Sequence, residues 1–228
     1  MGDYKEVLSR LAAYRKRLGI TQEQIAGKIN ISQEQYSYLE NGITKLTYKD
    51  LKVLLELGWN INYIITGRED CSQGTELEEV FHGFMDEEGK EFALKLCAEV
   101  MIEKAVRCGL TEKNSRLRDE LALLEDMVES WQHFSMCYHV RKQLQLSQLV
   151  MADKLGVGIR KYRDLERENR YPDAEMLLHF YDMSGYQPML FMDFYDRRML
   201  LIKQIWGVFA KQEREEILGF IDYVKRML

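Results

Sequence analysis

The chain has 228 residues, and its 32 Lys and Arg against 37 Asp and Glu give a formal net charge of −5 at neutral pH. This length suffices for two domains, and the acidic balance argues against non-specific coating of nucleic acid, although one basic face would suffice for a specific DNA-binding protein. Only two prolines interrupt a sequence rich in Leu, Glu, Lys, Gln and Met, so we expect an all-α fold.

The first predicted helix covers residues 3–18, where apolar residues recur at steps of three and four. Its last turn carries Arg15, Lys16 and Arg17 before Gly19 ends it. Cations suit the C-terminus of a helix. Lys16 and Arg17 are therefore compatible either with a solvated helix end or with contacts to phosphate, and the sequence leaves both interpretations open.

Two capping boxes follow, Thr21-x-x-Gln24 and Ser32-x-x-Gln35, and each predicts the start of a short helix. Asn30 lies between them and can adopt a tight turn, while the small side chain of Ala26 allows a second helix to pass closely. This pattern predicts two short helices joined by a sharp turn, a helix-turn-helix.

With the sequence LENG at residues 39–42, a helix capped by Thr47 and the closing sequence NINYIITG at residues 60–67, this region resembles the XRE-type helix-turn-helix, the DNA-binding domain of phage repressor and Cro proteins. The resemblance covers residues 7–67. It implies a lambda-repressor-like fold and a structural ion pair between Arg15 and Glu40. It also implies that Gln22 and the loop at Thr44 and Lys45 contact the DNA backbone.

The resemblance makes residues 32–39 the recognition helix, whose N-terminal residues touch base edges in such domains. Gln can bind adenine through two hydrogen bonds, and Glu can accept from the amino group of cytosine. The alternative is that these side chains are ordinary solvated residues. The predicted DNA contacts of this first copy are Gln22, Ser32, Gln33, Glu34, Ser37, Tyr38, Asn41 and Lys45.

A second copy follows when the chain is shifted by 126 residues: residues 15–40 align with 141–166 without a gap, and nine of the 26 positions are identical. Arg141 and Glu166 then fall on Arg15 and Glu40, which predicts a second structural ion pair. A weaker match at a shift of 124 places Leu77 on Leu201. It suggests that each helix-turn-helix domain is followed by a helical hairpin.

The second copy departs from the family pattern, because Gly158 replaces the capping Ser32 and Glu168 replaces Gly42. Its recognition helix is basic, which suits phosphate binding or the reading of guanine by arginine. The alternative is a domain that kept its fold but no longer binds DNA. The predicted DNA contacts of this copy are Gln148, Ile159, Arg160, Lys161, Arg163, Arg167 and Arg170.

The remaining segments carry apolar residues at helical spacing, in 76–108, 111–133 and 199–228. Such stripes are more often packing surfaces between domains or subunits than cofactor sites. The four cysteines form no CxxC pair, and the sequence contains no phosphate loop and no nucleophile beside a base. We therefore expect no metal, no other cofactor and no enzymatic activity. No apolar run approaches the roughly 18 residues of a membrane span, and the N-terminal sequence is not a signal peptide, so we expect a cytoplasmic protein.

The predicted domains are a first helix-turn-helix at 1–68, a helical linker at 75–130, a second helix-turn-helix at 131–194 and a C-terminal hairpin at 195–228. The sequence favours a bacterial-type transcriptional regulator that binds double-stranded DNA, with the first copy reading bases and the second contacting DNA less specifically. A homodimer through the helical segments is a further option, and an effector is unknown. The alternative is a protein-interaction module, adaptor or antitoxin-like, that retains the fold without binding DNA.

Overall fold

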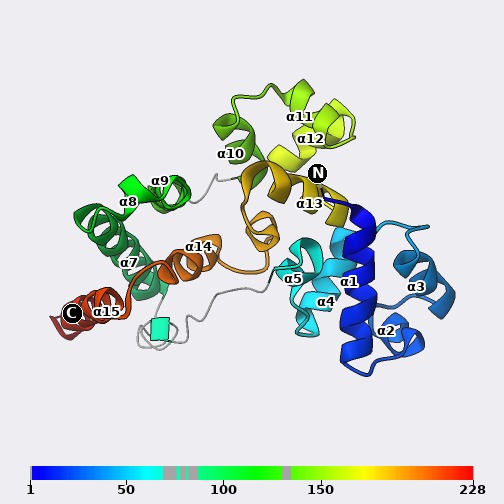
Figure 1. Ribbon diagram of the computed structural model, residues 1–228, viewed down its shortest axis with the longest axis horizontal. Coiled ribbons are helices and arrows are strands. Elements are labelled where there is room, and N and C mark those ends of the chain that lie inside the picture. The colour runs from blue at the N-terminus through cyan, green and yellow to red at the C-terminus, as the bar shows by residue number, and fades with distance from the viewer. Residues whose placement is uncertain (1, 69–75, 78–80, 82–86, 130–134, 228) are drawn as a thin grey trace. The chain divides into compact units, whose positions relative to one another are not determined.

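The computed structural model describes residues 2–68, 76–77, 81, 87–129 and 135–227. In these residues the regular elements are α-helices and one 3-10 helix, with no strand, which confirms the all-α prediction for the part described. The chain divides into two compact units (Figure 1). Unit 1 comprises Met1–Asp70 and Ser135–Phe194, and unit 2 comprises Cys71–Phe134 and Tyr195–Leu228.

The first segment of unit 1, residues 2–68, contains five helices. They are α1 Tyr4–Arg17, α2 Gln22–Lys28, α3 Gln33–Glu40, α4 Tyr48–Glu56 and α5 Ile61–Thr66. Both predicted capping boxes are present. The Thr21 and Ser32 hydroxyls each accept a hydrogen bond from the backbone N–H of the Gln three residues on, and the side chain of that Gln accepts one from the backbone N–H of the capping residue. These bonds satisfy N–H groups that a helix start would otherwise leave unpaired.

The second segment of unit 1, residues 135–194, contains four α-helices and one 3-10 helix. They are α10 Met136–Gln143, α11 Gln148–Lys154, α12 Ile159–Glu166, α13 Ala174–Ser184 and η2 Pro188–Phe191. Ser147 caps α11 with its hydroxyl, whereas Gly158 at the start of α12 provides no side-chain bond. The core of this segment includes Tyr162 and Phe180, neither of which is exposed.

Three backbone positions in the left-handed region recur at an interval of 126 residues in the two segments. The pairs are Gly19 and Gln145 (φ 68° and 55°), Asn30 and Gly156 (59° and 63°), and Gly42 and Glu168 (73° and 57°). Non-glycine residues rarely adopt positive φ. The chain therefore turns in the same way at matched positions of both segments, even where the residue type differs.

The two segments of unit 1 pack directly on one another. The Ala174 N–H donates to the Leu46 carbonyl at 3.1 Å, and the rings of Tyr48 and Tyr171 stack with centroids 4.5 Å apart. The side chain of Asn62, which is buried, donates to Gln187 at 2.7 Å and accepts from the backbone N–H of Met189 at 3.0 Å. Polar bonds with both partners thus fix the position of η2 against α5.

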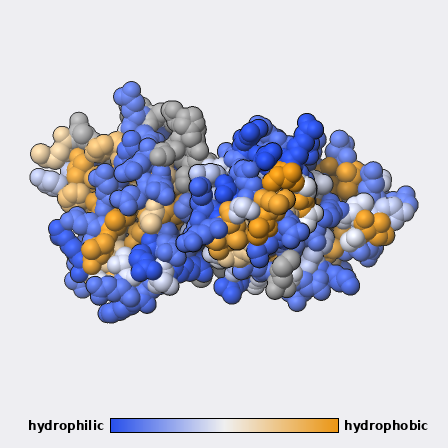
Figure 2. All heavy atoms as spheres, turned by 90° about the horizontal axis from the view of Figure 1, so that it is seen from above, coloured by the Kyte–Doolittle hydropathy of each residue, from blue (hydrophilic) through white to orange (hydrophobic). Residues whose placement is uncertain are grey.

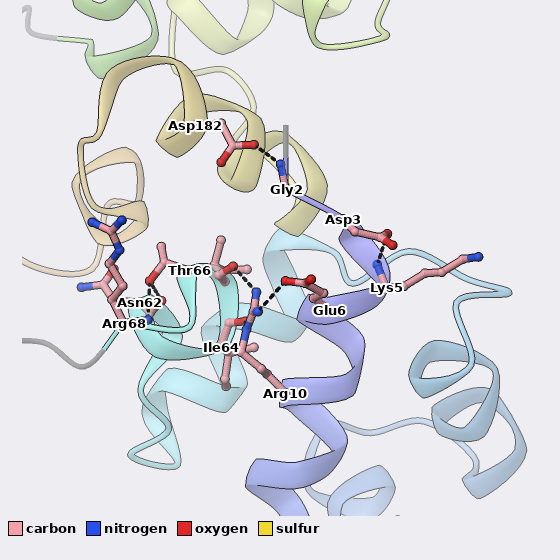
Figure 3. A network of polar contacts seen from close by, with 11 residues as sticks. Gly2, Asp3, Lys5, Glu6, Arg10, Asn62, Ile64, Thr66, Arg68 and Asp182 are labelled. Carbon is pink, nitrogen blue, oxygen red and sulfur yellow. Dashed lines mark hydrogen bonds and ion pairs between the residues drawn. The ribbon is translucent and has the colours of Figure 1, made fainter.

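A polar network near the start of the chain connects α1 with α5 (Figure 3). The Arg10 guanidinium donates to the carbonyls of Ile64 and Ile65 at 2.9 and 2.6 Å and also contacts Glu6. It thereby satisfies carbonyls at the end of α5 that have no partner within the helix. The backbone N–H of Gly2 donates to Asp182 of α13, so the second segment also contacts the start of α1.

Unit 2 contains five described helices. They are α7 Glu87–Arg107, α8 Leu110–Lys113, α9 Ser115–Glu129, α14 Arg197–Trp206 and α15 Lys211–Met227. Their apolar stripes pack against each other inside this unit, with α7 contacting α9, α14 and α15. Residues 78–80, 82–86 and 130–134 of the predicted stripes lie outside the described residues.

The visible surface is mostly hydrophilic and carries separate apolar patches (Figure 2). In unit 2, the predicted stripe residues Phe92, Val208 and Phe220 are exposed rather than packed. No helix among the described residues is long and apolar enough to cross a membrane.

We expect an Asn62→Ala substitution to lower the free energy of unfolding by about 2 kcal/mol, because it leaves the buried N–H of Met189 without that acceptor. Urea unfolding followed by circular dichroism measures the change. Asn169→Ala, at an exposed position after α12, is the matched control. Equal stability of the two variants would show that the Asn62 bonds contribute nothing.

Candidate nucleic-acid interface

Helix α3 buries one face and exposes the other. Tyr36 and Leu39 are buried in the core of the first segment, whereas Gln33, Glu34 and Tyr38 are exposed and Ser37 is half-buried. Tyr36 and Leu39 thus attach one face of α3 to the core and leave its other face accessible. The side chains that the sequence assigns to base contacts lie on the side away from the core, beside the exposed cap Ser32.

Several exposed polar groups of α3 are held by neighbours on the same helix. The Tyr38 hydroxyl donates to Glu34 at 2.5 Å, and this bond raises the pKa of Tyr38. The Asn41 amide donates to the Ser37 hydroxyl at 3.3 Å. The side chain of Gln33 has no hydrogen-bond partner among the described residues. Its amide, at the first position of the helix, can therefore donate to and accept from a ligand.

A buried ion pair fixes the end of α3 to α1. Arg15 donates to the two carboxylate oxygens of Glu40 at 2.7 and 3.1 Å and to the Ile20 carbonyl at 2.8 Å. Gln22 also donates to Glu40, at 2.8 Å. Burial disfavours ionisation of Glu40, but the hydrogen bonds from Arg15 and Gln22 outweigh it and lower the pKa of this carboxyl. The amide nitrogen of Gln22 is thus already engaged within the protein.

The second segment repeats this arrangement. Arg141 forms an ion pair with Glu166 and donates to the Leu146 carbonyl at 3.1 Å. Gln148 donates to Glu166 at 2.5 Å, as Gln22 does to Glu40. The partners are 25 residues apart in sequence in both ion pairs. Burial is also similar, because all four side chains of the two pairs are about one-tenth exposed or less.

The exposed side of α12 and the following loop is rich in arginine. Arg160, Arg163, Arg167 and Arg170 are exposed, and Ile159 is half-buried. Some of this charge is paired locally, since Lys161 lies 3.6 Å from Asp173 and Arg170 lies 3.8 Å from Asp164. Arg163 donates to Gln148 at 3.2 Å. Such contacts between exposed groups are weak, so the guanidinium groups can still turn toward a phosphate.

Two exposed apolar residues beside this basic surface were not singled out from the sequence. Leu149 is 68% exposed and Val150 is 43% exposed at the start of α11. At an interval of 126 residues they correspond to Glu23 and Gln24 of the first segment. The replacement of polar by aliphatic residues at these positions was the signal in the sequence that could have identified them.

Lys45 lies where the two segments meet. Its ammonium group is 2.5 Å from the Glu175 carboxylate of α13, and this hydrogen bond raises the pKa of Lys45. The lysine thus forms a surface ion pair between the two segments, and its contact with DNA stays a prediction. The sequence left two roles open for Lys16 and Arg17 at the end of α1. Both residues are exposed, and the Arg17 guanidinium lies over the ring of Tyr14, 4.5 Å from its centroid.

Unit 1 presents two exposed helices whose geometry is suited to binding. Within the described residues, no group of three or more His, Cys, Asp or Glu side chains could hold a metal ion. Instead, a short helix with an exposed N-terminus projects from the core of the first segment, and an exposed basic helix projects from the second (Figure 1). Such a helix can enter the major groove of DNA.

Comparison with known proteins assigns a family to part of the first segment. Residues 11–57 match the model of the Helix-turn-helix family, and they form a helix-turn-helix domain, the class that inserts a recognition helix into DNA. More particularly, the domain is of the XRE type and points to a DNA-binding regulator. No curated protein and no solved structure matched the chain.

We expect Arg15→Met to lower the free energy of unfolding by about 3–5 kcal/mol, because the substitution leaves the buried Glu40 carboxylate without its countercharge. Urea unfolding at pH 7 measures this loss. Lys16→Met is the control, since its side chain is exposed in the same helical turn. A loss no larger than that of the control would contradict a structural role for the pair.

The same pair predicts a dependence on pH. The pKa of Glu40 is lower in the folded protein than the value of about 4.3 in an unfolded chain. Its contribution to stability is therefore complete above about pH 4.3 and disappears as the pH falls through the folded pKa. Glu40→Gln removes this part of the acid sensitivity, which unfolding curves measured between pH 3 and 7 would detect.

Proposed function

We propose that the chain is a sequence-specific DNA-binding transcriptional regulator in which both segments of unit 1 are repressor-like helix-turn-helix domains. In this proposal the first segment reads bases through α3, and the second, more basic segment contacts DNA less specifically through α12. The main observation is the exposed N-terminal turn of α3, with Gln33 accessible, inside the region that matches the Helix-turn-helix family.

Three repeated features support a tandem duplication. The left-handed backbone positions recur at an interval of 126 residues, the Arg–Glu ion pairs have the same sequence separation, and each carboxylate accepts from a glutamine that starts the second helix. Unrelated helical segments would share an amphipathic pattern, but they would not share turn conformations and a buried polar arrangement at one constant offset.

The contacts between the two segments support an arrangement like that of a symmetric dimer. Arg68 lies over the ring of Tyr181 in α13, and Phe194, which corresponds to Arg68 at the same interval, lies beside Lys52 of α4. Equivalent positions thus pack on equivalent helices of the opposite segment, as in the two-fold interface of a homodimer. This direct packing of the two segments supports a pseudo-dimer within one chain.

Two joined domains with different recognition helices predict an asymmetric DNA site. A symmetric repressor dimer reads two equal half-sites about 34–36 Å apart on one face of the duplex. Here the exposed residues of α3 are mostly uncharged or acidic, and those of α12 are arginines. One half-site would therefore be read mainly through hydrogen bonds to bases. The other would be held mainly through phosphate contacts.

The principal test is the selection of bound duplexes from a random pool by the full chain. We expect an asymmetric consensus, with one chain bound per site. Gln33→Ala should lose about 1–3 kcal/mol of preference at one base pair while keeping its affinity for random DNA. Gln143→Ala, an exposed glutamine at the end of α10, is the control. A perfect palindrome that binds two chains would contradict the pseudo-dimer.

Removal of a phosphate contact should have a different signature. We expect Arg160→Ala to weaken binding to specific and random duplexes alike and to reduce the slope of log K against log salt by about one. Fluorescence anisotropy at several salt concentrations measures both effects. Arg226→Ala, an exposed arginine of α15 in unit 2, should leave the slope unchanged. An unchanged slope for Arg160→Ala would remove α12 from the DNA interface.

A protein-interaction module is the second candidate. The exposed Leu149 and Val150 at the start of α11 favour it, because aliphatic side chains gain nothing from a position beside phosphate. The arginines next to them would then attract an acidic partner. Absence of salt-dependent binding to any duplex would support this candidate over a DNA-binding regulator.

A further inference from the structure

Helix α15 of unit 2 has one buried apolar face and one exposed apolar face. Ile217 and Ile221 are buried, and α15 packs beside α7 in this unit (Figure 1). Phe220, Tyr223 and Met227 form the exposed face, because residues three and four positions apart lie on the same side of a helix. Their exposed fractions are 47%, 61% and 72%. We refer to these three residues as the α15 patch.

The α15 patch differs from the apolar residues that are scattered over most protein surfaces. Single exposed apolar side chains are common, whereas several of them in a continuous row mark a site of interaction. Aromatic residues and methionine are also the types that are enriched in the cores of protein interfaces. The row follows one face of a helix, so a second helix is the partner that can cover all three side chains at once.

Gly219, next to the α15 patch, gives an independent indication of a partner. Glycine inside a helix is less favourable than alanine, because it loses more conformational freedom on folding. In the part of the chain that the structure describes, a Cβ atom at Gly219 would meet nothing within 4 Å apart from adjacent residues and the backbone of its own helix. Packing within this part therefore does not require glycine, although a partner lying close to Phe220 would.

The spacing of the α15 patch fits a second copy of the same helix. Phe220 lies three positions before Tyr223, and Met227 lies four positions after it. A two-fold axis at Tyr223 between antiparallel helices therefore places Phe220 of each copy against Met227 of the other, with the two Tyr223 rings in contact at the axis. Aromatic rings pack favourably on a thioether and on each other. A two-fold interface requires this kind of self-complementary patch.

The charges beside the α15 patch fit the same antiparallel arrangement. Asp222 and Arg226 are exposed, and they lie one turn apart on the same side of the patch. In an antiparallel pair with two-fold symmetry, the same side of both helices comes together. Asp222 of each copy then faces Arg226 of the other. Exposed ion pairs contribute little affinity, so this complementarity specifies the orientation of the helices more than the strength of the dimer.

We propose that α15 is the interface of a homodimer, in which two copies of the chain pair in antiparallel orientation through the α15 patch. Three side chains from each copy bury less than the roughly 1,200 Å² of a stable interface, so the dimer is weak and forms at micromolar concentrations. The inference does not depend on DNA binding, because every residue involved belongs to unit 2. If unit 1 binds DNA as proposed, one dimer carries two DNA-binding units and can hold two sites at once.

The test is sedimentation equilibrium of the full chain, without DNA, from about 1 to 200 μM. We expect a monomer at the lowest concentration and a dimer at the highest. Tyr223→Glu places two carboxylates at the axis and should weaken the dimer about tenfold or more. Val106→Glu, which changes an apolar residue of α7 that is 60% exposed, is the matched control. A chain that stays monomeric throughout, or a dimer that Tyr223→Glu leaves unchanged, would overturn the proposal.

A charge exchange tests the orientation of the two helices. Arg226→Asp alone places like charges opposite each other and should weaken the dimer about threefold or more. Addition of Asp222→Arg restores opposite charges and should recover the affinity. A double variant as weak as the single one would overturn the antiparallel arrangement. At the nanomolar concentrations of DNA titrations the weak dimer is dissociated, so Arg226→Ala remains a valid control there.

Gly219→Ala separates the stability of α15 from its role in the dimer. We expect this substitution to raise the melting temperature of the dilute chain by about 1–4 °C, because alanine favours the helix. The same methyl group should weaken the dimer, because it occupies space beside Phe220 that the other copy needs. Thermal melts of all variants verify folding. A dimer that Gly219→Ala leaves unchanged or strengthens would contradict close packing at this position.

Discussion

The buried pair of Arg15 and Glu40 is the interaction on which the placement of the recognition helix depends. It joins the last turn of α1 to the last residue of α3, and Gln22 at the start of α2 completes it. The Glu40 carboxylate thus connects the three helices α1, α2 and α3. A buried ion pair adds little net stability but penalises other arrangements that would separate its members. The direction in which α3 projects is fixed by this requirement.

The sequence was sufficient for the features that rest on local chemistry. The capping hydroxyls of Thr21 and Ser32 bind where their spacing predicts, because a capping box needs only four consecutive residues. The pairing of Arg15 with Glu40 and of Arg141 with Glu166 also agrees with the sequence, because the resemblance supplied the first pair and the 126-residue repeat supplied the second.

Contacts between residues far apart in sequence could not be predicted in the same way. The sequence predicts that Lys45 contacts DNA. In the structure Lys45 pairs with Glu175, which lies 130 positions away, and no sequence pattern indicates this pairing. The association of α7 and α9 with α14 and α15 in one unit was equally hidden, since an amphipathic helix does not specify its partner. The sites for DNA contact in both segments stay predictions, and most of their side chains are exposed.

The packing of the two segments of unit 1, through Asn62, Tyr48 and Tyr171, has a consequence for dosage. A repressor assembled from two separate chains must first associate, so at low abundance its occupancy of an operator rises with the square of the protein concentration. A chain that already contains both halves in contact avoids this step. For the proposed regulator, occupancy would rise in simple proportion to abundance, and a few molecules per cell would respond linearly to changes in their synthesis.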